Sequence, residues 1–375
     1  MHRLIQIFLG GMIALFFSGI GFWLTLAPND VSAEQNRLVV FEASLSRGCP
    51  YCQEGSEAIN QLADEYAAAN QPVLFLEYNA DCNGCYFGRE DRFSRSGADF
   101  LLPMVIIDSG QQSSSRPADY YTTYKSMVDT ALARTAVPQV ETEVKSRRTT
   151  GYIGYDLEFT VTVTNTSGIN LGIANNAMLH AVVYEAGQDE AGLTANYVWG
   201  SAYDAISPEM AVGESRTFTL TVESLSSLLN WDHLASIIMV DYRPGGSTGP
   251  ADMLQAIKIP GASFTVSQQA TPDPVQPGAP LAYTIRLVNT GGMDLHATIT
   301  DTLPTNVTYT GPALVWTPTI TAPGGVWEQT FNVTVADDYT GPLVNMLEVT
   351  TDEGVHGVFT HLTNGNKIHL PLINR

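Results

Sequence analysis

The stretch that decides the fold lies at residues 46–55 and consists of SRGCPYCQEG. It places Cys49 and Cys52 two residues apart, with a proline between them, and the apolar residues Ile59 and Leu62 follow at the spacing of one helix face. Two cysteines at this spacing suit three kinds of site: a redox-active dithiol, an inert structural disulfide, or one half of a four-cysteine zinc site.

The predicted helix favours redox chemistry at this pair. A thiol near a helix N-terminus meets unpaired backbone N–H groups and the positive end of the helix dipole, and both stabilise the thiolate. Pro50 suits the first turn of a helix, and Arg47 adds a positive charge nearby. We therefore expect Cys49 to be the exposed nucleophile that forms a mixed disulfide, and Cys52 to be the thiol that resolves it.

A second pair, Cys82 and Cys85, follows the strand predicted at residues 72–80. All four cysteines lie within residues 49–85, so we expect them to serve one local site and not to cross-link the whole chain. If the two strands are parallel, this pair lies at the same sheet edge as Cys49. One interpretation of the second pair is a relay that exchanges electrons with the first pair. The alternatives are a structural disulfide and a pair of thiols without a function. A four-cysteine zinc site is the remaining alternative, since 29 residues separate the two C-x-x-C pairs.

The first 33 residues predict export from the cytoplasm. Arg3 precedes an apolar run from Leu4 to Ala27, and the small residues up to Ala33 suit cleavage by a signal peptidase. The run is also long enough to span a bilayer, so residues 1–33 are either a cleaved signal peptide or a retained membrane anchor. Both alternatives place the remaining chain at the cell surface or in the medium, where disulfides persist.

The charge and the absence of other motifs exclude several functions. The chain has 375 residues with 38 acidic and 18 basic side chains, a formal charge of -20, and no dense basic run. This composition disfavours nucleic acids and anionic membrane surfaces as partners. The seven histidines include no pair four residues apart, and no nucleophile elbow, phosphate-binding glycine loop or EF-hand loop is present. The carboxylates of DTLPTN and DEGVHG suit calcium, but solvated turns explain them more simply. We therefore predict no cofactor and, outside the zinc alternative, no metal.

Residues 37–136 alternate between strand-like and helix-like segments. This order predicts a partly parallel sheet covered by helices, which defines an α/β domain. The expected strands are residues 37–44, 72–80 and 104–109, and the expected helices are residues 51–69, 90–95 and 120–134.

The order of these motifs resembles the thioredoxin superfamily. A strand is followed by CPYC at the start of a helix, then by a second strand, and finally by Pro103 directly before a third strand in LLPMVIIDSG. The tetrad CPYC is similar to that of glutaredoxins. The resemblance implies that the peptide bond before Pro103 is cis, that this proline abuts the active-site disulfide, and that backbone groups of Leu102 help to hold the substrate chain.

The sequence departs from the family pattern near the cysteines. Thioredoxins carry a tryptophan directly before the first cysteine, where this chain has Gly48, and they bury an acid in the first strand, where it has Val40. Glu42, two positions later, is therefore a candidate proton acceptor that would tune the cysteines. No glutathione-binding set follows Pro103, so the expected partners are thiols or disulfides of exported proteins, together with a membrane redox partner.

The chain after residue 137 alternates apolar and polar residues in short strand-like segments. FTVTVTNT at 159–166 and LAYTIRLVNTGG at 281–292 follow one repeated formula, and RTFTLTV at 216–222 is echoed by QTFNVTV at 329–335. This repeat spacing predicts two related β-sandwiches. The second, with its NTG and DTLP motifs, resembles a bacterial cell-surface repeat family of unknown function, whose Ig-like modules imply spacing or adhesion.

These observations predict a multidomain chain. Its expected parts are a signal peptide or anchor at 1–33, an α/β thioredoxin-like domain at 36–137, two all-β Ig-like sandwiches at 138–262 and 263–364, and a tail at 365–375. The expected function is extracytoplasmic thiol-disulfide exchange by Cys49 and Cys52. The alternative is a non-catalytic surface interaction or adhesion protein that uses the thioredoxin-like region as a scaffold.

Overall fold

The computed structural model describes residues 38–80, 89–134, 140–186, 196–227, 229, 231–246 and 248–365. The described residues all belong to one compact unit. None of the described helices is both long and apolar enough to cross a membrane. The predictions for the first 33 residues, for Cys82 and Cys85, and for the tail from residue 366 onward concern residues outside the described part of the chain.

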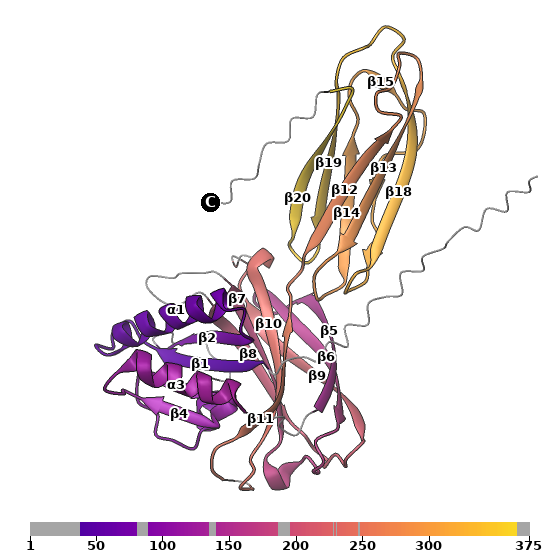
Figure 1. Ribbon diagram of the computed structural model, residues 1–375. Helices are drawn as coiled ribbons and strands as arrows, with labels where there is room; N and C mark the ends of the chain where they lie inside the picture. The colour runs from indigo at the N-terminus through magenta and orange to yellow at the C-terminus, as the bar shows by residue number, and fades with distance from the viewer. Residues whose placement is uncertain are drawn as a thin grey trace, which may run out of the picture. The chain divides into compact units, whose positions relative to one another are not determined.

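The N-terminal part of the chain is an α/β region, in agreement with the predicted alternation. Its strands run in the order β2-β1-β3-β4, with β1 parallel to β2 and antiparallel to β3. Helices α1 and α3 lie side by side on one face of these strands (Figure 1). The elements are β1 (Val39–Leu45), α1 (Cys52–Ala68), β2 (Val73–Asn79), α2 (Arg89–Ser94), β3 (Met104–Ile107), a 3-10 turn (Asp108–Gly110), β4 (Gln112–Ser115) and α3 (Tyr120–Leu132).

A local sequence signal accounts for the start of one helix in this region. Helix α3 begins after Asp119, whose carboxylate accepts a hydrogen bond of 2.9 Å from the backbone N–H of Thr122. Strand β4 is an exception, because its sequence Gln-Ser-Ser-Ser has no apolar alternation and predicts no strand. It forms by pairing with β3, in a register that places Ser115 opposite Met104.

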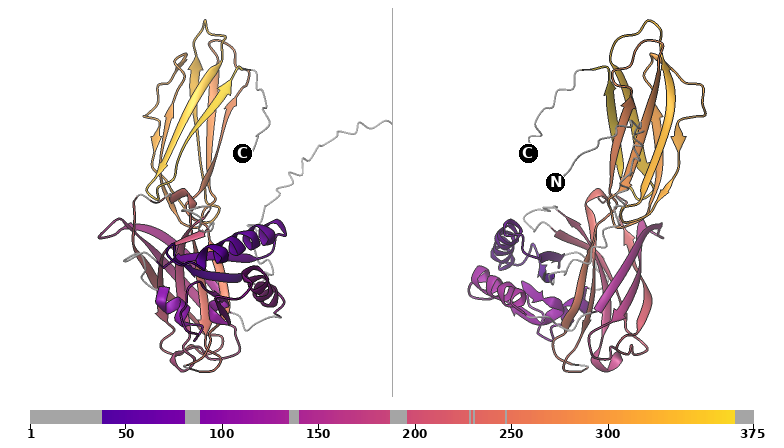
Figure 2. Two further views of the ribbon diagram at one scale, coloured as in Figure 1. Left: turned by 90° about the vertical axis from the view of Figure 1, so that its left-hand side faces the viewer. Right: turned by 45° about the vertical axis from the view of Figure 1, so that its right-hand side comes forward.

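The side chains of β1 alternate between two different surroundings. Phe41 and Leu45 pack in a core with residues of α1 and α3, whereas Val40 belongs to a second core on the opposite face. Later β-strands contribute to that second core through residues such as Tyr184 and Met239. Figure 2 shows the N-terminal strands with the helices on one side and later strands on the other. Both faces of β1 are therefore buried.

The later strands also continue the N-terminal sheet. One sheet of eight strands has the order β11-β10-β7-β8-β2-β1-β3-β4, and β8 joins it beside β2 at the pair Glu77–Tyr197. The sheet thus crosses the domain boundary predicted at residue 137. A separate sheet has the order β5-β6-β9. The elements of this part are β5 (Val140–Thr150), β6 (Tyr155–Asn165), β7 (Met178–Ala186), β8 (Asn196–Ala205), β9 (Ser215–Leu225), β10 (Leu234–Tyr242), β11 (Asp252–Ile259) and 3-10 turns at Ile173–Asn175 and Trp231–His233.

The last part of the chain consists of strands in two sandwich-like sheets, ordered β12-β13-β18-β15 and β16-β14-β19-β20, with β17 also paired to β14. Buried and exposed residues alternate along β14 and β19, and Tyr283 and Leu347 from the two sheets are fully buried. The strands are β12 (Phe264–Thr271), β13 (Pro280–Asn289), β14 (Leu295–Thr302), β15 (Val307–Thr308), β16 (Val315–Trp316), β17 (Thr319–Ile320), β18 (Val326–Val335), β19 (Leu343–Thr351) and β20 (His356–Thr363).

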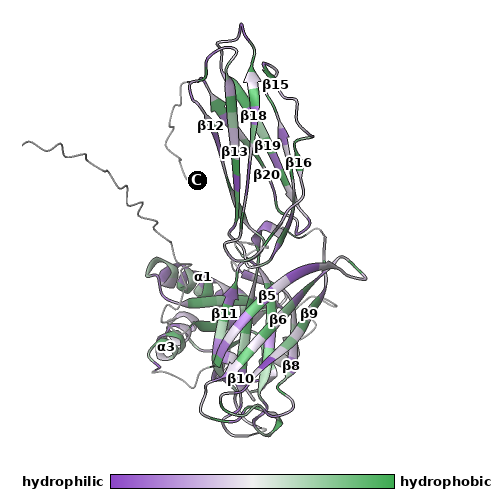
Figure 3. Ribbon diagram, turned by 90° about the vertical axis from the view of Figure 1, so that its right-hand side faces the viewer, coloured by the Kyte–Doolittle hydropathy of each residue, from purple (hydrophilic) through white to green (hydrophobic). Residues whose placement is uncertain are grey.

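The sequence repeat recurs in the strand pairing. Strand β6 pairs with β9, and the matching strands β13 and β18 also form an antiparallel pair. Asn165 and Asn289, the asparagines of the repeated Asn-Thr, each donate from Nδ2 to the carbonyl oxygen four residues later, at 2.8 and 2.9 Å. Figure 3 shows hydrophilic and hydrophobic residues alternating along β5 and β6. The repeated sequence motif therefore marks equivalent strands and an equivalent turn.

Candidate active site

Cys49 and Cys52 form a disulfide at the start of α1, with their Cα atoms 5.3 Å apart. Helix α1 begins at Cys52, and the backbone N–H of Cys52 donates to the carbonyl of Cys49 at 3.1 Å. The Cys52 side chain is buried, whereas Cys49 is partly exposed. This difference suits a pair in which a thiol or disulfide from another molecule reaches the Cys49 sulfur first, and the buried Cys52 sulfur then reacts with Cys49.

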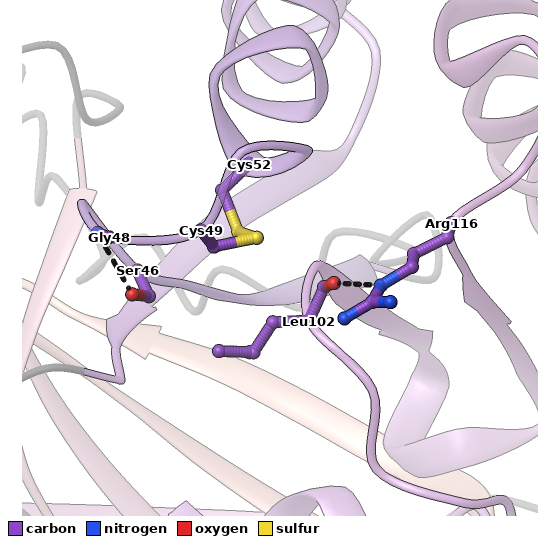
Figure 4. The surroundings of a disulfide bond; sticks show 6 residues. All are labelled: Ser46, Gly48, Cys49, Cys52, Leu102 and Arg116. Atoms are coloured by element: carbon purple, nitrogen blue, oxygen red, sulfur yellow. Dashed lines mark hydrogen bonds between the residues drawn. A yellow bond between two sulfur atoms is a disulfide. The ribbon is translucent and has the colours of Figure 1, made fainter.

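Pro103 lies against the first turn of the same helix. The Leu102–Pro103 peptide bond is cis. A Cβ placed on Gly55 of α1 would lie only 3.3 Å from Pro103 Cγ, so the glycine allows the proline to approach the helix. Leu102 packs in the same core as the two cysteines, and Figure 4 shows it beside the disulfide. The structure therefore brings together Cys49, Cys52 and Pro103, which come from separate parts of the sequence.

A groove of about 590 Å³ opens beside the disulfide. The loop from β1 to α1 shapes one side of it, because the Ser46 Oγ accepts a hydrogen bond of 3.2 Å from the Gly48 backbone N–H (Figure 4). The exposed Arg47 also lines the groove, near the cysteines as its sequence position implied. The remaining lining residues are Pro50, Gln53, Ser56, Glu57 and Asn60, together with the two cysteines. Both sulfur-bearing residues thus border a polar opening.

Arg116 is a residue of this site that no sequence motif indicates. Its Nε donates a hydrogen bond of 2.5 Å to the carbonyl oxygen of Leu102, and its guanidinium lies 4.8 Å from the centre of the Tyr51 ring. Arg116 directly follows β4, so only the β3–β4 pairing brings it beside Leu102. The sequence contained no signal for this contact, because β4 itself was not predicted.

Glu42 does not lie beside the cysteines. It follows Phe41 on β1, so its side chain points to the face opposite α1, and it is fully buried there. Arg92 of α2 donates to its carboxylate from both Nε, at 2.9 Å, and Nη2, and the Tyr78 hydroxyl donates to it at 2.7 Å. This position corrects the expectation that Glu42 would accept a proton from the cysteines. Its contacts are those of a structural ion pair.

The pair of Glu42 and Arg92 belongs to a larger buried cluster of charges. Arg92 Nη1 also lies 3.3 Å from Asp241 Oδ2 on β10, and Arg95 Nη2 contacts the other oxygen of that carboxylate. His180 Nε2 on β7 lies 3.0 Å from Asp241 Oδ2. The cluster therefore ties α2 both to the N-terminal strands and to the later strands.

The pKa values of the cluster follow from burial and mutual attraction. Burial opposes ionisation of Asp241, but contacts with His180, Arg95 and Arg92 outweigh burial and hold the pKa of Asp241 well below its usual range. Burial lowers the pKa of His180, and attraction to Asp241 offsets this in part. Burial and the neighbouring Glu42 raise the pKa of Tyr78 well above its usual value. Asp241 is therefore ionised at neutral pH, between the guanidinium groups of Arg92 and Arg95.

The hypotheses about metal and about electron relay remain predictions. Cys82 and Cys85, on which both depend, lie outside the described residues. Among the residues that the structure does describe, no group of three or more His, Cys, Asp or Glu side chains is placed to hold a metal ion.

Comparisons with known proteins add little to this picture. No protein-family model matches the chain, and no curated protein matches it. Among solved structures, the chain is similar to a transglutaminase of the red sea bream, at 13% sequence identity and a TM-score of 0.29. The match covers 79% of this chain and 41% of the other, so this chain spans less than half the length of that protein. A TM-score of this size supports no argument about fold or function.

Proposed function

We propose that the chain is an extracytoplasmic thiol-disulfide oxidoreductase whose N-terminal α/β region is thioredoxin-like. The observation that carries the proposal is the Cys49–Cys52 disulfide at the N-terminus of α1, with Pro103 against the first turn of that helix. A helix N-terminus favours the thiolate form of a nearby cysteine, and the thiolate is the species that attacks disulfides. The strand order β2-β1-β3-β4 with helices on one face also agrees with this family.

The reaction proceeds in two exchange steps. In the reduced protein the Cys49 thiolate attacks one sulfur of a substrate disulfide, which forms a mixed disulfide and releases the other substrate sulfur as a thiolate. The Cys52 thiolate then attacks the Cys49 sulfur, so that the Cys49–Cys52 bond forms and the substrate leaves with both thiols reduced. Two electrons pass from the dithiol to the substrate. The same steps in reverse oxidise a substrate dithiol, and the reduction potential of the pair sets the direction.

The surroundings of the pair support these roles. The partial exposure of Cys49 lets a substrate sulfur approach it, and the burial of Cys52 keeps it available for the second step alone. The groove beside the disulfide gives a substrate segment room to lie along α1. Export, the two Ig-like sandwiches after residue 137 and their resemblance to surface modules belong to the proposal. They would place the dithiol outside the cytoplasm, where its substrates would be exported proteins.

Turnover of a disulfide-bonded protein tests the proposal. We expect the reduced full chain, in the presence of dithiothreitol, to accelerate the reduction of insulin, and a Cys49→Ser variant to lack this activity. A Cys52→Ser variant serves as the matched control, because it keeps the nucleophile but cannot resolve the mixed disulfide. A wild-type chain without turnover, together with an ordinary thiol pKa at Cys49, would instead favour a non-catalytic interaction protein.

A further inference from the structure

Arg116 is held in an unusual position above the site. Its φ angle is 50°, in the left-handed region that residues with a Cβ rarely adopt. A glycine would fit this backbone at lower cost, so the arginine occupies this position at a local conformational penalty. Its two fixed contacts go to Leu102 and Tyr51, which flank the disulfide on two different loops. Figure 4 shows Arg116 and Leu102 together beside the disulfide.

The contact between Arg116 and Leu102 occupies a backbone acceptor beside the reactive pair. Nε of Arg116 donates to the Leu102 carbonyl, directly before the cis-proline. Under the proposed function, a substrate N–H that binds this carbonyl oxygen, which has two lone pairs, weakens or displaces the hydrogen bond from Arg116. Arg116 Nε then loses its acceptor. Because an unsatisfied charged donor raises the free energy of the complex, binding is favoured when the substrate supplies another acceptor.

The guanidinium can donate hydrogen bonds to a new acceptor in place of the Leu102 carbonyl. It is exposed, and among the described residues no carboxylate forms an ion pair with it and no further acceptor takes its two terminal nitrogens. A carboxylate on the substrate would restore the lost contact with a stronger one, because Arg binds carboxylates through two parallel, charge-assisted hydrogen bonds. A neutral or basic substrate segment offers no such replacement.

We propose that Arg116 selects substrate segments that carry a carboxylate next to the reacting cysteine. The proposal rests on the proposed thiol-disulfide exchange and names its substrate class. Arg116 is then a specificity residue that meets the substrate directly. The ring of Tyr51, half exposed beneath the guanidinium, keeps the positive charge over the cysteine motif through the contact at 4.8 Å.

Three peptides test this selection. Each contains one cysteine, activated as a mixed disulfide with neutral 2-thiopyridine, and the peptides differ only in having Glu, Gln or Lys next to that cysteine. The Cys49 thiolate of the reduced full chain attacks the peptide sulfur and releases 2-thiopyridone, which is followed by its absorbance. We expect the Glu peptide to react about tenfold faster than the Lys peptide, and the Gln peptide at an intermediate rate. The ratio of rates cancels any change in Cys49 ionisation, because all three peptides meet the same thiolate.

Two substitutions separate selection by charge from a structural role. Arg116→Gln keeps an N–H donor for Leu102 but removes the charge, and we expect its Glu to Lys ratio to fall to about one. Arg116→Lys keeps the charge and is expected to retain part of the preference. The control is Arg286→Gln, which removes an exposed positive charge from β13 and is expected to keep the preference. A wild-type chain that reacts equally with all three peptides, or an Arg116→Gln chain with an unchanged ratio, overturns the inference. A wild-type chain that reacts with none of them contradicts the proposed function instead.

Discussion

Arg92 on α2 and Asp241 on β10 form a buried ion pair, with Nη1 3.3 Å from Oδ2, although 149 positions separate them in the sequence. Neither side chain is more than 1% exposed. The same guanidinium holds Glu42 on β1, so one arginine connects the first strand of the α/β region with the later strands. The two regions also share the eight-stranded sheet and a hydrophobic core. We infer that the α/β region and strands β7, β10 and β11 stabilise each other.

Asp241→Leu is therefore expected to destabilise both regions together. The change leaves Arg95 without its carboxylate and Arg92 with only one, and removing one partner of a buried pair costs about 3–5 kcal/mol. Hydrogen exchange should show lost protection in β1 and in β10. The matched control is Arg147→Met, which removes an exposed pair with Glu158 and is expected to change nothing measurable. Loss of protection confined to β10 would contradict the mutual stabilisation.

Glu42→Gln should separate stability from thiol chemistry. The variant weakens the buried pair with Arg92, so the free energy of unfolding is expected to fall by about 3 kcal/mol. The pH midpoint of Cys49 alkylation should not move, because Glu42 faces away from α1. Alkylation rates measured from pH 4 to 10 in the reduced chain test this. A midpoint that shifts in the variant would restore Glu42 as a residue that tunes the cysteines.

Asp301 on β14 gives the last sheets a dependence on pH. Its Oδ2 accepts hydrogen bonds from Asn345 Nδ2 at 2.7 Å and from Gln268 Nε2 at 3.3 Å. Burial nevertheless raises the pKa of this carboxyl from 3.8 to about 6. The folded state therefore holds the proton more tightly than the unfolded state, and stability is lost as the pH rises from about 4 to about 6.

Denaturation across this range tests the effect of Asp301. We expect the free energy of unfolding of the last sheets to fall by at most about 3 kcal/mol between pH 4 and 7, mostly below pH 6, and to change no further above pH 7 from this group. Asp301→Asn should flatten the profile, and the exposed Asp338→Asn should leave it as it is. Amide exchange in β14 and β19 assigns the change to these sheets. A rise in stability between pH 4 and 6 that disappears in Asp301→Asn would contradict the expected sign.

The sequence allowed prediction of those elements whose signals are local. Helix α1 was expected at 51–69 and occupies Cys52–Ala68, because apolar spacing and the proline mark it within one short segment. The repeated Asn-Thr likewise marks equivalent turns at Asn165 and Asn289. Strand β4 was missed because pairing with β3, and not its own composition, makes it a strand.

The site was predictable only where motifs are contiguous or carry a backbone signature. Cys49, Cys52 and Pro103 could be named from CPYC and from a proline before a strand. Arg116 could not, because its contact with Leu102 depends on the β3–β4 pairing. Glu42 was placed wrongly for a related reason. Its role depends on which face of β1 carries the helix, and the residues that pair with it, such as Asp241, are far away in the sequence.

Mixed-disulfide trapping with Cys52→Ala tests the central claim most directly. In this variant Cys49 can attack a substrate disulfide, but no neighbouring thiol can release the product. The prediction is that the variant, expressed in an exporting host, carries exported proteins linked to Cys49 by bonds that dithiothreitol breaks, and that the double variant Cys49→Ser with Cys52→Ala carries none. An empty trap in both oxidising and reducing media, from a folded variant with Cys49 accessible to alkylation, would contradict thiol-disulfide exchange as the function of this protein.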